Sequence, residues 1–291
     1  KEPGRRKAGY YATVGKIETG AGSTFFELEL ANMIRRRVKE WKEKGYPNVT
    51  STTKKLLEHW NRFEQEGFEQ GGRRYFWCQI EAIETIIWLT EAPDAVKGGI
   101  NLKDRSDSDW VRACTKLATG TGKTVVMAMI IAWQSLNKIA NQKDTRFSKN
   151  ILVMAPGITV RQRLSVLIPS NESNYYDDFE IIPPVLKEYI YQAKIVILNW
   201  HALAQKKKES LPKVMREMMG EESDTAFTKR VLSEFPGDTP ILVINDEAHH
   251  CHRHAAEIGK SKEDKELEKQ ENEEATIWVQ GLDKIHKARG I

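Results

Sequence analysis

From Tyr75 onward, short runs that are apolar at nearly every position alternate with longer amphipathic stretches. Four runs stand out, at 113–118, 151–155, 195–198 and 241–244. Strands that are buried on both faces have this pattern, whereas a strand with one wet face alternates apolar and polar side chains. Because helix-length segments separate the runs, crossover connections are expected between them. The pattern therefore predicts an α/β fold with a doubly wound, mostly parallel sheet.

The first 70 residues follow a helical pattern instead. Apolar side chains recur near helical spacing between Phe25 and Trp41, and the Gly-Tyr-Pro sequence at 45–47 is typical of a helix end. The hydroxyl side chains at 51–53 are N-cap candidates for a second helix. We therefore expect one amphipathic helix followed by another in this part of the chain.

Composition narrows the class of protein. The chain has 291 residues, 40% hydrophobic and 30% charged, with a mean hydropathy of −0.55 and no long apolar run or signal peptide. These values favour a soluble, cytoplasmic protein with two domains, residues 1–70 as a basic, mainly helical extension and residues 71–291 as the α/β domain. Cys78, Cys114 and Cys251 are odd in number and far apart, so we expect reduced, packed thiols. Because no Met begins the sequence, we expect it to be part of a longer chain.

Positive charge is concentrated at the N-terminus. Residues 1–60 hold a surplus of six basic side chains, although the whole chain has a net charge of only +4. The basic runs at 5–7, 35–37 and 54–55 either contact nucleic-acid phosphates or form a solvated face. The sequence leaves both interpretations open.

The first apolar run leads into a phosphate-binding loop, Leu-Ala-Thr-Gly-Thr-Gly-Lys-Thr at 117–124. Gly120 and Gly122 let backbone N–H groups turn toward phosphate oxygens at the start of a helix. Lys123 can reach the β- and γ-phosphates, and Thr124 offers a hydroxyl to Mg²⁺. The strict P-loop pattern has a further Gly where this chain begins the segment with Leu. The position between an apolar run and a helix nevertheless predicts nucleotide binding.

The fourth apolar run ends in Asp246-Glu247-Ala248-His249. A carboxylate at a strand end can hold the Mg²⁺ that bridges the phosphates, and the next carboxylate can deprotonate the attacking water. Asp246 and Glu247 suit these two roles. Together with the P-loop, they predict Mg²⁺-dependent hydrolysis of a nucleoside triphosphate.

The P-loop and the Asp-Glu-Ala-His segment resemble motifs I and II of superfamily 2 DEAD/DEAH-type helicases. The segments at 78–83, 155–161 and 199–202 are most similar to the Res (R) subunit of type III restriction enzymes. The resemblance covers about residues 75–291. It implies a RecA-like P-loop NTPase lobe that uses ATP and Mg²⁺.

Carried over residue by residue, the resemblance assigns roles to this site. It implies that Asp246 and Thr124 hold Mg²⁺, that Glu247 is the general base, and that His249 couples the nucleotide site to the nucleic-acid track or the partner lobe. Gln79 would read the adenine edge. The triphosphate would lie on Thr119, Gly120, Thr121, Gly122, Lys123 and Thr124.

Nucleic-acid contacts are implied less directly. The family grips a strand backbone with elements that correspond here to Gly157, Thr159, Arg161, Asn199 and His201. Their hydroxyl, guanidinium and amide groups suit phosphate binding, but an ordinary strand-to-helix connection with Thr159 as its N-cap explains part of the pattern equally well. An aromatic residue that stacks on adenine is Tyr75, Phe76 or Trp60, each of which is also a core candidate.

The implied function is the ATP-binding lobe of a DNA translocase or helicase in a restriction or other phage-defence enzyme. Its expected partners are duplex DNA through backbone contacts, a second RecA-like lobe, and a methyltransferase or specificity subunit, with no membrane. Because the second lobe supplies an arginine finger in the family, we expect residues 1–291 alone to be poorly active. The alternatives are an RNA helicase lobe and a non-hydrolysing clamp or scaffold.

The C-terminal third holds three further patterns. Four His and one Cys at 249–254 include zinc-type ligands but lack a second ligand pair at finger spacing. The charge-dense stretch at 260–271 is either a solvated helix or an insertion, and its Glu-Asp-Lys at 263–265 matches half of a nuclease motif by chance. Apolar residues between Ile277 and Ile285 predict a final helix.

Overall fold

The computed structural model describes residues 7–12, 24–66, 75–100, 113–204, 222–237, 239–248 and 262–291. Its elements, in chain order, are β1 (Gly9–Ala12), β2 (Thr24–Glu27), α1 (Glu29–Glu43), α2 (Ser51–Glu66), α3 (Trp77–Glu91), η2 (Asp94–Lys97), α4 (Lys123–Ala140), β3 (Asn150–Ala155), α5 (Ile158–Arg163), η3 (Leu164–Leu167), α6 (Tyr175–Asp178), η4 (Pro184–Gln192), β4 (Lys194–Asn199), η5 (Trp200–Leu203), α8 (Asp224–Val231), β5 (Leu242–Asn245) and α9 (Lys262–Arg289).

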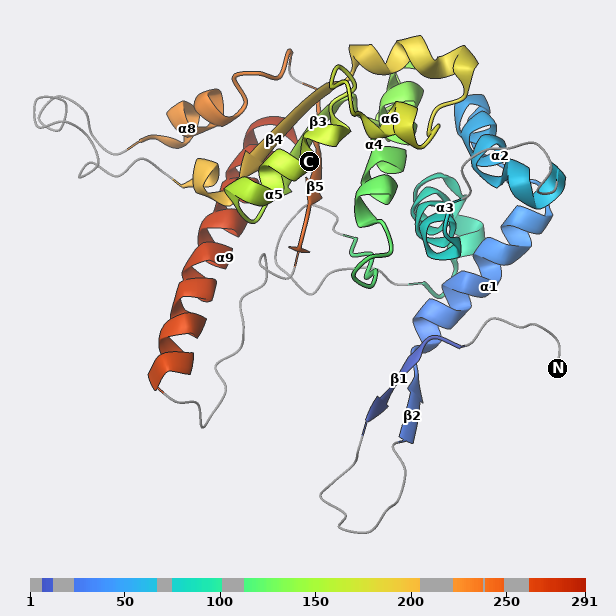
Figure 1. The fold of residues 1–291 in the computed structure, drawn as a ribbon, viewed down its shortest axis with the longest axis horizontal. Helices are drawn as coiled ribbons and strands as arrows, with labels where there is room; N and C mark the ends of the chain where they lie inside the picture. The colour runs from blue at the N-terminus through green and yellow to red at the C-terminus, as the bar shows by residue number, and fades with distance from the viewer. Residues whose placement is uncertain are drawn as a thin grey trace, which may run out of the picture.

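A parallel sheet in the order β4-β3-β5 forms the centre of the α/β part. Side chains alternate along β3, so that Ile151 and Val153 pack with α3 and α4 on one face. Leu152 and Met154 pack with α8 and α9 on the other. Helices therefore cover both faces of the sheet (Figure 1), and the predicted α/β fold is confirmed.

The predicted strand at 113–118 is wrong. The structure has irregular backbone there, and residues 113–116 are exposed. Thr115 and Lys116 interrupt the apolar run, and no strand in the described ranges pairs with it. Cys114 is exposed and Cys78 is half-buried, so the prediction that every thiol is packed is also wrong, while Cys251 lies outside the described residues.

The N-terminal helix is shorter than predicted. Phe25 and Phe26 belong to β2, which pairs with β1 in an antiparallel ribbon, and α1 begins only at Glu29. The aromatic Thr-Phe-Phe-Glu run suits a strand once a partner strand is available. The predicted helix end is confirmed, since Gly45 and Tyr46 have φ of +74° and +58°.

Helix α2 begins at Ser51, and the predicted N-caps at 51–53 are wrong by one residue. The hydroxyl of Thr50 accepts a hydrogen bond from the backbone N–H of Thr53 at 3.0 Å. A cap side chain must stand just outside the first turn to reach that N–H group, which explains the shift.

Both N-terminal helices contribute to the core of the α/β part. Trp41 of α1 and Leu56, Leu57 and Trp60 of α2 are buried in one cluster with Trp133 of α4. At the other end of the chain, α9 confirms the predicted final helix and includes most of the charge-dense stretch. None of the helices in the described ranges has the length and apolarity needed to cross a membrane.

Candidate active site

The carboxyl ends of all three parallel strands lie at one edge of the sheet. Ala155, the last residue of β3, is opposite Asn199 of β4, and Met154 is opposite Asn245 of β5. The backbone N–H of Asp246 then donates to the Met154 carbonyl at 2.9 Å, so the pairing holds this residue at the edge. In open α/β sheets, ligands bind at this edge.

The phosphate-binding loop ends where α4 begins. Gly120 and Gly122 have φ of +78° and +76°, a left-handed conformation that favours glycine, and Gly122 is the N-cap residue of α4. The helix N-terminus directs backbone N–H groups and a partial positive charge at whatever lies beyond the loop. Thr121 donates from its hydroxyl to the Ala118 carbonyl at 2.6 Å, which closes the turn.

Gln79 joins the start of α3 to this loop. Its side-chain N–H₂ donates to the carbonyls of Thr121 (3.1 Å) and Gly122 (3.3 Å), and its Oε1 accepts from the backbone N–H of Phe76 at 2.8 Å. The side chain is buried. Gln79 therefore positions the loop, and its predicted contact with adenine stays a prediction.

Lys123, Asp246 and Glu247 converge at the sheet edge. Nζ of Lys123 donates to Oε1 of Glu247 at 2.6 Å, and the Glu247 backbone N–H donates to Oδ1 of Asp246 at 3.1 Å. The hydrogen bond to Glu247 raises the pKa of Lys123, which stays charged. Burial raises the pKa of the Asp246 carboxyl, as does the Glu247 charge, while the charges of Lys123 and Arg163 oppose the rise.

Glu247 also has a strained backbone, with φ of +51°. For a residue other than glycine, this conformation costs about 1–3 kcal/mol and persists where the surroundings impose it, commonly at functional sites. The strain follows directly after β5, whose Asn245 accepts a hydrogen bond from the Trp278 indole of α9 at 3.0 Å. Helix α9 thus helps to fix the strand end that carries the two carboxylates.

The donor set fits a hard divalent cation. Asp246 offers carboxylate oxygens, and Thr124, in the first turn of α4, offers a hydroxyl, which are ligands that Mg²⁺ prefers. Lys123 and Glu247 are both partly exposed, so ligands in solution can reach the pair.

The candidate nucleic-acid residues lie at the same sheet edge. Gly157 is the N-cap residue of α5, so the alternative that made Thr159 the N-cap is wrong, and Thr159 is exposed within the helix. Nε of Arg161 donates to the Ile197 carbonyl of β4 at 2.9 Å.

The other two candidates lie at the end of β4 and just after it. Asn199 is the N-cap residue of η5, and the exposed His201 ring stacks on Trp200 at 3.8 Å between centroids. The contacts of all these candidates with nucleic acid stay predictions.

The three aromatic candidates for adenine stacking differ in how far their side chains are exposed to solvent. Tyr75 and Trp60 are buried, and their polar groups donate to the carbonyls of Phe179 (2.7 Å) and Ile181 (2.8 Å). Phe76 is 60% exposed beside Gln79. Tyr75 and Trp60 therefore have structural partners, and Phe76 has a ring that a nucleotide can reach.

Two residues near the site were missed from the sequence. Trp77 is 60% exposed beside Phe76, and Arg163 lies close enough to Asp246 for its charge to lower the pKa of that carboxyl. The Arg-Gln-Arg sequence at 161–163, directly after the 155–161 segment, was the signal that could have identified Arg163. His249 and the neighbouring His/Cys cluster lie outside the described residues.

Comparison with known proteins agrees with this site. No curated protein and no solved structure matches the chain. Residues 74–284, more than half of the chain, match the family described as "Type III restriction enzyme, res subunit". This family has an ATPase and helicase domain of superfamily 2 with a RecA-like fold. The chain therefore belongs to the type III restriction enzyme res subunit family.

Proposed function

We propose that this chain is the ATP-binding lobe of an ATP-dependent DNA translocase or helicase in a type III-like restriction or other phage-defence enzyme. The observation that carries the proposal is the convergence of Lys123, Asp246 and Glu247 at the sheet edge, where the two-glycine loop and the N-terminus of α4 also lie. Residues 1–70 form a basic extension in this proposal, and residues 71–291 form the lobe.

The ion pair between Lys123 and Glu247 defines the first step. The ammonium of Lys123 and the carboxylate of Glu247 form an ion pair at 2.6 Å. When a triphosphate lies on the loop, Lys123 moves to its β- and γ-phosphates. Glu247 would then orient and deprotonate the attacking water.

Asp246 and Thr124 would hold Mg²⁺, which neutralises charge on the phosphates during transfer. Phe76 stacks on the adenine in this proposal, while Gln79 keeps the loop in place through the two carbonyls that it binds. His249 relays the state of the nucleotide to the nucleic-acid track.

A second RecA-like lobe completes the cleft. Lys123 and Glu247 are both partly exposed, so an arginine finger of a partner lobe would have access to them. Such an arginine increases turnover by roughly 10³–10⁵-fold. Residues 1–291 alone should therefore bind ATP but hydrolyse it slowly, and robust DNA-stimulated turnover by this segment would refute the two-lobe arrangement.

The substitution Glu247→Gln tests the base. In the full-length protein it should abolish ATP turnover while ATP binding remains, because the amide keeps the shape but accepts no proton. Turnover is measured by phosphate release, and binding with a fluorescent ATP analogue. Glu234→Gln is the matched control, since Glu234 forms only an exposed ion pair with Lys194. Unchanged turnover in Glu247→Gln would exclude the assigned role.

The nature of the nucleic acid needs a separate comparison. Duplex DNA should stimulate turnover by the full-length protein more than duplex RNA, because B-form and A-form helices present their phosphates differently. Stronger stimulation by RNA would favour an RNA helicase. No turnover with either, despite ATP binding, would favour a non-hydrolysing clamp.

A further inference from the structure

The two-stranded ribbon of β1 and β2 projects beside the first turn of α1 (Figure 1). Both strands carry exposed aromatic side chains. In its two strands, Tyr10 is directly opposite Phe26 and Tyr11 is opposite Phe25. The ring centroids of these pairs are 5.5 and 5.1 Å apart. Because side chains alternate across a strand, each face of the ribbon carries one pair. We call these four residues the aromatic ribbon.

The four side chains of the aromatic ribbon are exposed. Tyr10 and Tyr11 are 55% and 71% exposed, and Phe25 and Phe26 are 36% and 37% exposed. A two-stranded ribbon that packs on no core is only marginally stable, and exposed apolar surface of this kind marks an interaction site.

The ribbon is nevertheless fixed to the body. The side chain of Asn32 in α1 accepts from the Ala8 N–H at 2.7 Å and donates to the Ala8 carbonyl at 3.0 Å. The same carbonyl accepts from the Leu28 N–H at 2.9 Å. These bonds anchor the base of the ribbon to α1 before any ligand arrives, which lowers the entropy cost of binding.

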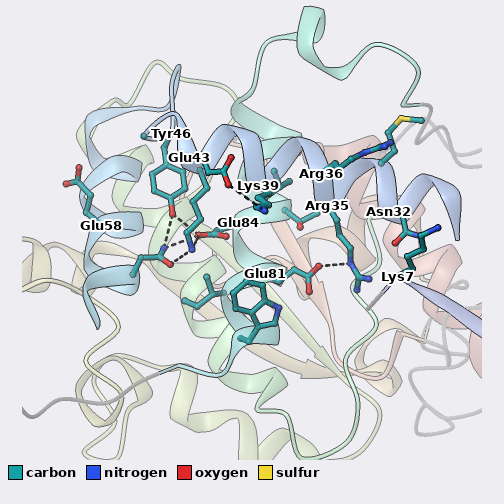
Figure 2. A pocket seen from close by; sticks show the side chains of 18 of the residues that line it. Lys7, Asn32, Arg35, Arg36, Lys39, Glu43, Tyr46, Glu58, Glu81 and Glu84 are labelled. Atoms are coloured by element: carbon teal, nitrogen blue, oxygen red, sulfur yellow. Dashed lines mark hydrogen bonds and ion pairs between the residues drawn. The ribbon is translucent and has the colours of Figure 1, made fainter. Parts of the chain in front are cut away.

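Charged side chains of both signs lie at the base of the ribbon, where Lys7 and Arg35 are close to Glu27 and Glu29. A groove of about 1060 Å³ runs along α1, with Lys7, Asn32 and Arg35 together at one end (Figure 2). Arg35 and Lys7 form ion pairs with Glu81 and Glu27, whereas the exposed Arg36 has no carboxylate partner within the described ranges. Residues 1–60 also hold the chain's whole positive surplus.

The ribbon also projects from the end of the molecule that carries the active site. In Figure 1 it extends in the direction in which β5 runs, toward the end where the loop before α4 lies.

We propose that the aromatic ribbon binds unpaired bases of a nucleic-acid strand by stacking, with Arg36 and Lys7 next to the phosphates. The proposal rests on the proposed nucleic-acid motor function. Flat rings on both faces beside basic groups are the elements that bind single strands, since every base has a π face. Reading base edges in a duplex needs hydrogen-bonding side chains, of which the ribbon has only two hydroxyls.

The test uses the full-length protein and a labelled single-stranded oligonucleotide at fixed salt. The double variants Tyr10→Ala/Phe26→Ala and Tyr11→Ala/Phe25→Ala should each weaken single-strand binding roughly tenfold, the order expected for loss of stacking on one base. Tyr10→Phe/Tyr11→Phe should keep wild-type affinity, because the rings remain. Val185→Ala/Tyr189→Ala removes equally exposed apolar side chains on η4 and is the control.

Three results separate the proposals. Weaker single-strand binding with unchanged ATP binding and melting temperature supports the stacking role. Unchanged single-strand binding in both double variants overturns it, and a change in oligomeric state would then assign the ribbon to protein docking. If the wild-type protein binds no nucleic acid at all, the proposed motor function fails as well.

Discussion

Gly122 combines two constraints at one position of the phosphate-binding loop. Its φ is +76°, and a Cβ atom placed there would lie 2.2 Å from Nε2 of Gln79. A side chain at this position would therefore strain the backbone and displace the group that holds the loop carbonyls.

The substitution Gly122→Ala should weaken ATP binding at least tenfold and lower the unfolding free energy by about 1–3 kcal/mol. A fluorescent ATP analogue and urea unfolding measure the two effects. Gly98→Ala is the control, since Gly98 has an ordinary φ and its nearest neighbouring atom is 3.9 Å from the added Cβ. Wild-type ATP affinity in Gly122→Ala would contradict the close approach of Gln79.

At the scale of elements, one buried carboxylate joins three helices. Glu91, at the end of α3, accepts from the backbone N–H of Thr50 (2.9 Å), the hydroxyl of Thr53 (2.6 Å) and the indole N–H of Trp133 in α4 (2.8 Å). Asn137 of α4 donates to the Thr53 hydroxyl at 2.9 Å. The first turn of α3 contacts the phosphate-binding loop through Gln79, and α4 begins where the loop ends. The start of α2 therefore connects α3 and α4 at the ends that lie away from the loop.

Removal of the Glu91 carboxylate should lower the free energy of unfolding. Glu91→Ala removes the acceptor of three hydrogen bonds, and of these donors the Trp133 indole keeps a second acceptor, the Thr53 hydroxyl at 3.1 Å. We therefore expect a loss of about 1–3 kcal/mol in unfolding free energy, measured by urea denaturation. Glu234→Ala removes an exposed carboxylate and should cost less than about 1 kcal/mol. Equal effects of the two substitutions would show that the network adds little to stability.

The contact between α2 and the segment before η4 should depend on pH. Nε2 of His59 donates to the Glu180 carbonyl at 2.7 Å. Burial lowers the pKa of His59 below 6.5; the Glu180 carbonyl and carboxylate oppose this shift, and the Arg62 charge adds to it. Above pH 6.5 the ring is neutral in both folded and unfolded chains. Below it the unfolded chain binds the proton more readily, so stability falls as the pH drops from 6.5 through the folded pKa.

His59→Gln tests this dependence, because the amide can still donate to the carbonyl but does not titrate. Unfolding free energies of wild type and variant at pH 8 and pH 5.5 should show a larger loss for wild type, of at most about 1.4 kcal/mol for each unit by which the pKa is lowered. Parallel losses in the two proteins would exclude His59 as the titrating group.

The sequence correctly predicted the elements that are defined by a short run of consecutive residues. Strands β3, β4 and β5 are apolar without interruption, and the chemistry of the P-loop and of Asp246-Glu247 is contained in short segments. The failures depend on distant partners. Phe25 and Phe26 form a strand only because β1 pairs with them, and 113–118 lacks such a partner within the described ranges. The bond between Gln79 and the loop spans more than 40 residues of sequence.

At the scale of the whole molecule, the N-terminal helices are part of the main core. Trp41, Leu56 and Leu57 are buried in the cluster that also holds Ile83 of α3 and Trp133 of α4. The aromatic ribbon, by contrast, contacts the body mainly through the hydrogen bonds between Ala8, Leu28 and Asn32. The sequence predicts a division at residue 70. Apolar packing nevertheless continues from the helices before this position to the helices after it.

Two truncations distinguish these contributions. A chain that begins at residue 29 loses β1, β2 and the segments beside them but keeps α1 and α2, and it should unfold cooperatively near the melting temperature of residues 1–291. A chain that begins at residue 71 also loses α1 and α2 and exposes the apolar surfaces of α3 and α4. We expect it to lack a cooperative transition and to bind hydrophobic dyes, because the remaining core is incomplete. Thermal unfolding followed by circular dichroism measures both. A cooperative transition in the shorter chain would show that residues 71–291 fold independently of the N-terminal helices.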